Sequence, residues 1–251
     1  MMGFFKEIFV LISRSLRKLF KRTNGSTLEQ NVEKDGFLVV DNYVSVDDCN
    51  LIRELIDEAV NNEKSNVWRS NDGSDVRVHG INDIYPVIDE KIKTQELLAV
   101  GEKILNKKLK SYFIMAGKLS YVKGNLGSGG GWHRDSAFKD QYKVIIYLSN
   151  VEVCNGPFQY IKGSHRFIQK LGLLVKSKLP LSRTRFSEPE LESSLDKTAT
   201  LCANKGSAIF VNTKGIHRGK PISEGFRYAL TLYCWEGVIP NHLGELLQNE
   251  K

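Results

Sequence analysis

The stretch KVIIYLSNVEVCNGPFQYI, residues 143–161, decides the class of fold because it places two short apolar segments on either side of a turn. Residues 143–148 and 158–161 are rich in β-branched and aromatic side chains, which are typical of strands. Asn155, Gly156 and Pro157 lie between them and favour a tight turn. Short strands joined by such turns predict a β-sandwich or barrel.

The same pattern continues along the chain. Further strands are predicted over residues 36–40, 112–122, 133–138, 208–211, 216–218 and 226–235. Helices are predicted mostly before the strands, over residues 28–34, from a cap at Ser45 to about residue 61, and over residues 94–105. We therefore expect residues 27–251 to form a single, mainly β domain with flanking helices. The charged and poorly patterned residues 170–204 are predicted to be an insertion that interrupts the sheet.

Composition and charge exclude some classes of protein. The 251 residues are 41% hydrophobic and 26% charged, which is ordinary for a globular domain. Six Lys or Arg against one Glu give residues 1–22 a net charge of +5, which leaves +2 of the total +7 for the rest. With a net charge of only +2, the chain after residue 22 is not expected to have a basic surface for a phosphate backbone, so no nucleic-acid partner is expected. Four cysteines without a C-x-x-C pair predict free thiols in a reducing cytoplasm.

The N-terminal stretch MMGFFKEIFVLISRSLRKLFKR, residues 1–22, has the apolar spacing of an amphipathic helix, and residues 23–26 (TNGS) follow it as a hinge. Its longest uninterrupted apolar run, residues 8–12, is too short to span a bilayer. Two interpretations stay open. The helix packs on the domain or on another chain, or it lies in an anionic membrane surface and makes a cytoplasmic protein membrane-associated.

The stretch GSGGGWHRDSAF, residues 127–138, contains the first candidate metal ligands. If His133 begins a strand, its imidazole and the carboxylate of Asp135 project from one face while Arg134 faces away. Two histidines and one carboxylate form a facial triad, which suits Fe(II) and oxygen chemistry. The third ligand has to come from elsewhere in the chain.

Four other histidines are available for the third position. His79 and His242 lie in stretches without strand pattern, which predicts surface or loop positions. His165 lies in a turn, where a hydrogen bond to the backbone is expected. His217 differs because it follows the apolar strand predicted over residues 208–211, and we select it as the third ligand.

Arg227 is a candidate for binding a carboxylate. In the strand predicted over residues 226–235 it shares one face with small or polar side chains, Ala229, Thr231 and Tyr233, and the opposite face is apolar. A guanidinium in a partly apolar space favours a carboxylate that it can bind through two parallel hydrogen bonds. The carboxylate belongs either to a diacid cosubstrate or to the protein, across the sheet.

With these residues in this order, the chain resembles the phytanoyl-CoA dioxygenase family of Fe(II)- and 2-oxoglutarate-dependent oxygenases. The similarity runs from about residue 35 to 235, through EKDGFLVVDNYVS, WHRD, VIIYLSNVEVCNGPFQYIKGSHR, KGSAIFVNTKGIHRG and GFRYALTLYCW. The resemblance implies a double-stranded β-helix, a cupin-like jelly roll with helices outside. It also implies that His133, Asp135 and His217 bind Fe(II), and that Arg227 binds the distal carboxylate of 2-oxoglutarate.

The activity that this resemblance implies is dioxygenation: O2 and 2-oxoglutarate are consumed, a C–H bond of a small-molecule or lipid-like substrate is hydroxylated, and succinate and CO2 are released. Asp135 favours hydroxylation because related halogenases lack this carboxylate. Residues 127–131 are expected to be a pliant segment at the pocket mouth, and residues 176–185 a lid or a surface loop. Two alternatives stay open: a zinc hydrolase, which leaves Arg227 without a role, and a jelly-roll binding module without activity.

The membrane interpretation of residues 1–22 predicts that their deletion removes co-sedimentation with anionic liposomes, because their Lys and Arg side chains are expected to meet the lipid headgroups. Sedimentation of the full chain and of the truncated chain measures this. Equal sedimentation of the two chains would leave the packed helix as the explanation.

Overall fold

The computed structural model describes residues 27–62, 65–139 and 141–240 together with residues 243 and 247. The helix and hinge predicted over residues 1–26 lie outside the described residues. Within the described ranges, no helix combines the length and the apolar character needed to cross a membrane.

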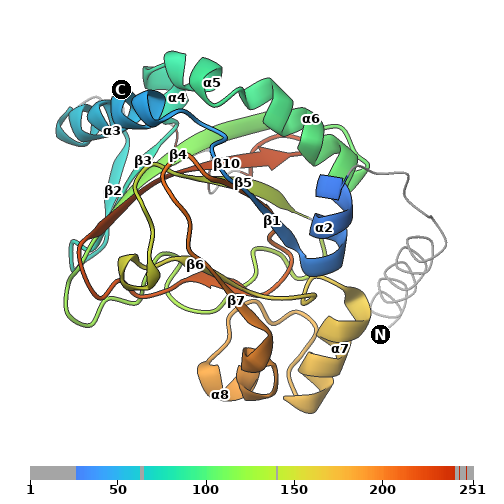
Figure 1. Ribbon diagram of the computed structural model, residues 1–251. Helices are drawn as coiled ribbons and strands as arrows, with labels where there is room; N and C mark the ends of the chain where they lie inside the picture. The colour runs from blue at the N-terminus through green and yellow to red at the C-terminus, as the bar shows by residue number, and fades with distance from the viewer. Residues whose placement is uncertain (1–26, 63–64, 140, 241–242, 244–246, 248–251) are drawn as a thin grey trace.

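Two antiparallel sheets face each other in the described part of the chain (Figure 1). The larger sheet has the strand order β1-β8-β5-β10-β4-β3-β2. Its strands are β1 (Phe37–Val40), β2 (Val67–Arg69), β3 (Asp75–His79), β4 (Ser111–Ser120), β5 (Tyr142–Tyr147), β8 (Ala208–Asn212) and β10 (Phe226–Trp235). The smaller sheet has the order β7-β6-β9 and consists of β6 (Phe158–Ile161), β7 (Thr198–Leu201) and β9 (His217–Gly219). This is the arrangement expected of a jelly roll.

Helices cover the outer faces of both sheets (Figure 1). The larger sheet is covered by α3 (Val46–Asn61), α4 (Ile81–Ile84), α5 (Val87–Lys91) and α6 (Thr94–Leu105), and α2 (Thr27–Asp35) lies beside β1. Beneath the smaller sheet lie α7 (Phe167–Lys176) and α8 (Glu188–Leu191). Two 3₁₀ helices, η1 (Val153–Asn155) and η2 (Glu192–Lys197), complete the connections. The expectation of a mainly β domain with flanking helices is therefore confirmed.

The helix α3 begins where the sequence predicts. Ser45 is its N-cap, and the Ser45 hydroxyl oxygen accepts a hydrogen bond from the backbone N–H of Asp48 at 3.1 Å. Ile52 and Ile56 are fully buried against the larger sheet. Leu51, next to Ile52 in the sequence, is 37% exposed.

The strand β10 separates the core from the interior of the jelly roll. Tyr228, Leu230 and Leu232 point outward into the main hydrophobic core beneath the helices. Arg227 and Tyr233, on the alternate positions, line an internal cavity. The two faces that the sequence assigns to this strand are therefore confirmed, and β10 pairs with β4 along its whole length and with β5 from Ala229 to Tyr233.

The two sheets are joined internally by Tyr160 of β6. Its hydroxyl donates a hydrogen bond to the backbone oxygen of Asn212 on β8 at 2.8 Å. Gly36 and Gly215 lie directly against its ring, and a Cβ atom at either position would overlap the phenol. Tyr160 thereby positions the segment around Gly215, which leads to His217 two residues later.

Two sequence predictions need correction. Residues 133–138 do not form a strand: within this stretch His133 alone pairs, as isolated bridges to His217 and Arg185. The reason is that, in the antiparallel register of His133 with His217, the following residues run past residues 213–215, which form a turn, so the ladder ends at once. Residues 198–201, placed in an insertion that interrupts the sheet, instead form β7 and pair with β6.

The packing of Tyr160 predicts that Gly215→Ala destabilises the protein by about 1–3 kcal/mol, because the added methyl group forces the phenol out of its site. Thermal or urea denaturation measures the change. Gly172→Ala in α7 is the matched control, since nothing lies within 4 Å of its new Cβ and alanine favours the helix by about 1 kcal/mol. A Gly215→Ala variant as stable as the wild-type chain would contradict the packing described.

Candidate metal centre

The backbone brings the segments of His133 and His217 together. The His133 N–H donates to the His217 oxygen at 2.9 Å, and the His217 N–H donates to the His133 oxygen at 2.8 Å. The Asp135 N–H donates to the Thr213 oxygen at 3.0 Å. Asp135 and both histidines therefore meet although His133 and Asp135 do not belong to a regular strand.

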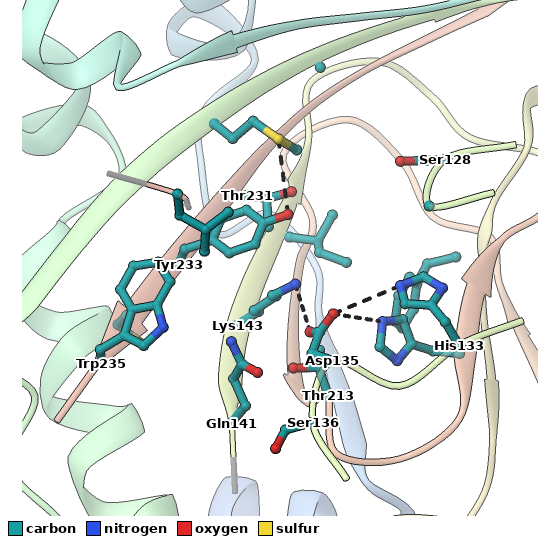
Figure 2. A pocket seen from close by; sticks show the side chains of 18 of the residues that line it. Ser128, His133, Asp135, Ser136, Gln141, Lys143, Thr213, Thr231, Tyr233 and Trp235 are labelled. Carbon is teal, nitrogen blue, oxygen red and sulfur yellow. Dashed lines mark hydrogen bonds and ion pairs between the residues drawn. The ribbon is translucent and has the colours of Figure 1, made fainter. Parts of the chain in front are cut away.

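The three side chains converge on one point (Figure 2). Their ligand atoms lie within 4.8 Å of one another, and the Asp135 Oδ1 atom lies 3.8 Å from His133 Nε2 and 3.9 Å from His217 Nε2. Each imidazole bonds through Nδ1 to a backbone oxygen two residues earlier, that of Gly131 or Gly215, at 2.9 Å. Since a carbonyl can only accept, both Nδ1 atoms carry the proton and both Nε2 lone pairs face the carboxylate.

Burial sets the protonation of this cluster. Burial and the neighbouring His133 lower the pKa of His217 to about 3, and burial also lowers the pKa of His133. Burial alone would raise the pKa of Asp135, but Lys143 and the two histidines together hold that pKa well below its usual range. At neutral pH the site therefore presents two neutral imidazoles and one carboxylate, which is the ionisation state that a divalent metal requires.

Lys143 of β5 is a member of the site that sequence reasoning missed. Its Nζ atom lies 2.6 Å from Asp135 Oδ2, and its side chain is 9% exposed. Burial alone would lower the pKa of Lys143, but Asp135 and Tyr233 raise it above its ordinary value, so the amine stays charged. The strand alternation of Lys143, Ile145 and Tyr147 was the available signal, because it places all three side chains inside the jelly roll.

Arg227 lies at the opposite end of the same cavity. It is 6% exposed, its Nη1 donates to the backbone oxygen of Gly156, and its Nε has no hydrogen-bond partner. Burial lowers the pKa of Arg227, an effect that Tyr147 opposes. No ion pair to a carboxylate joins it among the described residues, since nearby Asp75 is paired with Arg77 at 2.6 Å. A buried cation held in this way is suited to an incoming anion.

The glycine run packs over the ligands. Gly127, Gly129, Gly130 and Gly131 all have positive φ, and a Cβ atom on Gly129 would overlap the His133 imidazole. Arg185 donates to the Gly129 oxygen at 2.9 Å and lines the cavity. Close backbone approach to a ligand residue is thus a second reason for glycine here, besides the pliancy that the sequence suggests.

The buried guanidinium of Arg134 anchors the neighbouring loop. It faces away from the metal ligands, as predicted, and donates to the backbone oxygens of Arg183, Leu181 and Ala137. The Arg134 side chain therefore ties residues 181 and 183 of the predicted lid to the segment that carries the candidate ligands His133 and Asp135.

The cavity between the sheets has a volume of about 1050 Å³ and contains both the His-Asp-His cluster and Arg227. Its wall beyond Lys143 is formed by Tyr233 and Trp235 (Figure 2). A volume of this order accommodates a cosubstrate and a small molecule together.

The other two described histidines, His79 and His165, do not belong to the cluster. His165 bonds through Nε2 to the Glu33 oxygen at 3.0 Å, in agreement with its predicted backbone role. His79, predicted in a loop or on the surface, is instead 7% exposed at the end of β3, where it packs beside Phe113. His242 lies outside the described residues.

Comparison with known proteins places this site in a cupin-like oxygenase fold. The carbocyclase SnoK from nogalamycin biosynthesis is 17% identical over 88% of this chain and 91% of its own, with a TM-score of 0.65. The epimerase SnoN in complex with Fe3+, alpha ketoglutarate and nogalamycin RO is 14% identical over 89% of both chains, with a TM-score of 0.66. The apo form of EctD from S. alaskensis is 16% identical over 85% of this chain and 79% of its own, with a TM-score of 0.62. No curated protein sequence matches significantly.

The family model described as phytanoyl-CoA dioxygenase matches residues 32–229. The chain therefore belongs to the phytanoyl-CoA dioxygenase family, a family of Fe/2-oxoglutarate oxygenases, and the resemblance found in the sequence is confirmed. The double-stranded β-helix expected from the sequence agrees with these solved structures.

The lowered pKa of His217 predicts that the chelator-treated protein loses stability as the pH falls below about 6.5. The unfolded state takes up a proton near the ordinary pKa of 6.5, whereas the folded state resists it until about pH 3, so stability falls as pH falls through this window. Thermal denaturation between pH 7.5 and 5 measures the slope, and His217→Asn makes it shallower. An equally steep slope in this variant would contradict the burial argument.

Proposed function

We propose that the protein is an Fe(II)- and 2-oxoglutarate-dependent dioxygenase that hydroxylates a C–H bond of a small-molecule or lipid-like substrate. The observation that carries this proposal is the shared cavity: a His-Asp-His cluster with free Nε2 atoms lies at one position, and the buried Arg227, which has no carboxylate partner among the described residues, lies at another. Membership of the phytanoyl-CoA dioxygenase family supports it independently.

The donor set fits iron. Two neutral imidazoles and one carboxylate leave half of an octahedron open for cosubstrates. When bound, iron with O2 and 2-oxoglutarate supplies the oxidising chemistry, in which one oxygen atom enters the substrate as hydroxyl and the other enters succinate as CO2 is lost. Asp135 occupies the carboxylate position, which supports hydroxylation.

In this proposal the residues of the chain bind the metal, orient the cosubstrate and exclude water from the reacting atoms. We assign His133, Asp135 and His217 to holding the metal, and Arg227 to holding the distal carboxylate of 2-oxoglutarate. The cavity between the sheets limits the access of water to the reacting atoms. A cytoplasmic location stays a prediction from the sequence, and for residues 1–22 both a membrane contact and a packed helix stay open.

Two other functions are less well supported. A zinc hydrolase would use the same ligands but would leave Arg227 buried, charged and without a carboxylate partner. A binding module without activity would not need the ordered Nδ1 hydrogen bonds of both histidines. The similar structures include a carbocyclase and an epimerase, so the fold alone does not fix the reaction outcome.

The proposal predicts that the protein with Fe(II), 2-oxoglutarate and O2 forms succinate even without a prime substrate, and that it shows a visible charge-transfer band under anaerobic conditions. Asp135→Ala should abolish both signals. Arg227→Met should raise the KM for 2-oxoglutarate about 30-fold or more, because a buried charge pair is lost. Succinate is measured by chromatography.

His165→Ala is the control for histidine removal, because His165 lies in a surface turn away from the cluster. It should leave turnover unchanged. Succinate formation that persists in Asp135→Ala would reject the assigned ligands, and the absence of both succinate and the band in the wild-type protein would reject the proposed function.

A further inference from the structure

Arg227 and Lys143 lie at opposite ends of the cavity, which runs along β5 and β10. In their antiparallel register Tyr147 faces Ala229, and Lys143 faces Tyr233. Arg227 lies two residues beyond Ala229, so Arg227 and Tyr233 are six residues apart, about 20 Å along an extended strand. The Arg227 end is assigned to the cosubstrate, and the Lys143 end is therefore left for the substrate.

Lys143 has hydrogen-bonding capacity to spare. Its ammonium group lies between Asp135 and Tyr233 (Figure 2), at 2.6 Å from the carboxylate oxygen and 4.1 Å from the centre of the ring. An ammonium carries three N–H donors. Among the described residues, Asp135 and Tyr233 are the two partners at these distances, so at least one of the three donors is left for a group within the cavity.

The charges in the cavity also indicate that the positive charge of Lys143 is not fully balanced. Among the described residues, the largely buried charged side chains that line the cavity are Lys143 and Arg227, with two positive charges, and Asp135, with one negative charge; the Asp75–Arg77 pair there is neutral. A divalent ion and the dianion 2-oxoglutarate cancel each other, so one positive charge remains. Arg227 is then matched by the cosubstrate, and Asp135 is shared with the ion. A surplus buried charge is costly unless an opposite charge pairs with it.

An aromatic wall continues from Lys143. Tyr233 and Trp235 are stacked with ring centres 6.2 Å apart, and Phe113 stacks on Tyr233 from behind at 5.0 Å. Leu105, Leu109 and Met115 line the same end of the cavity. This surface favours an apolar or ring-shaped body rather than a strongly hydrated one.

We propose that the prime substrate carries an oxyanion, a carboxylate or a phosphate ester, that binds Lys143 while its apolar body packs on Tyr233 and Trp235. This inference rests on the proposed function. Lys143 thereby acts as a specificity-determining residue beside the metal ligands.

Lys118 provides a matched control. It lies on the outer face of the larger sheet, its Nζ is 2.6 Å from Asp57 Oδ1, and it lies 5.0 Å from the centre of the Tyr228 ring. It therefore has the same kinds of partner as Lys143 outside the cavity. Lys118→Met removes an equivalent charge without touching the site.

The test uses the full chain with Fe(II) and 2-oxoglutarate under anaerobic conditions. The probes are two matched pairs, 3-phenylpropionate with its amide and phenethyl phosphate with phenethyl alcohol. Binding is followed by perturbation of the charge-transfer band and by tryptophan fluorescence. At least one anion should bind about tenfold or more tightly than its neutral partner to the wild-type protein and to Lys118→Met. Lys143→Met should lose this preference, and Lys143→Arg should restore part of it.

The outcomes separate the two proposals. Absence of the charge-transfer band in the wild-type protein rejects the proposed function. A band without any preference for anions, or a preference that survives in Lys143→Met, overturns the role of Lys143. A parallel loss of 2-oxoglutarate affinity in Lys143→Met also overturns it, because Lys143 would then serve the cosubstrate. Tighter binding of 3-phenylpropionate identifies a carboxylate as the preferred oxyanion, and tighter binding of phenethyl phosphate identifies a phosphate ester.

Discussion

Two reciprocal backbone hydrogen bonds between His133 and His217 determine the geometry of the whole site. They join segments that are far apart in the sequence, and they do so without a long strand ladder. The Nδ1 hydrogen bonds to Gly131 and Gly215 then orient each ring, so the ligand atoms are positioned by backbone rather than by neighbouring side chains. Tyr160 supports one of the two segments from below and the glycine run covers the other.

The interior of the jelly roll contains the His-Asp-His cluster together with two buried cations, one on β5 and one on β10. Arg227 and Lys143 point inward from β10 and β5, on faces whose opposite sides form the main hydrophobic core. The outer face of the larger sheet thus packs into the hydrophobic core, and its inner face lines the cavity with charged side chains. Asp135 lies between the neutral imidazoles and the ammonium group, and it interacts with both through different oxygen atoms.

Features that depend on local pattern could be predicted from the sequence. The faces of β10 follow from strict alternation, and Ser45 begins α3 through a contact three residues away. Features that depend on a distant partner could not. The face of Lys143 follows from alternation, but its place beside the candidate ligands depends on Asp135, and whether residues 198–201 form a strand depends on β6. The strand predicted from His133 onward ends at once because the segment opposite it, residues 213–215, forms a turn.

The hydrogen bond from Arg227 to the Gly156 oxygen has a consequence for the thermodynamics of binding. A free arginine side chain carries roughly 2 kcal/mol of rotational entropy that an anion must remove before it is held. Here the turn at Asn155, Gly156 and Pro157 has already fixed the guanidinium during folding. If Arg227 holds a carboxylate, as proposed, the turn that marks the fold in the sequence also lowers the entropic cost of that binding.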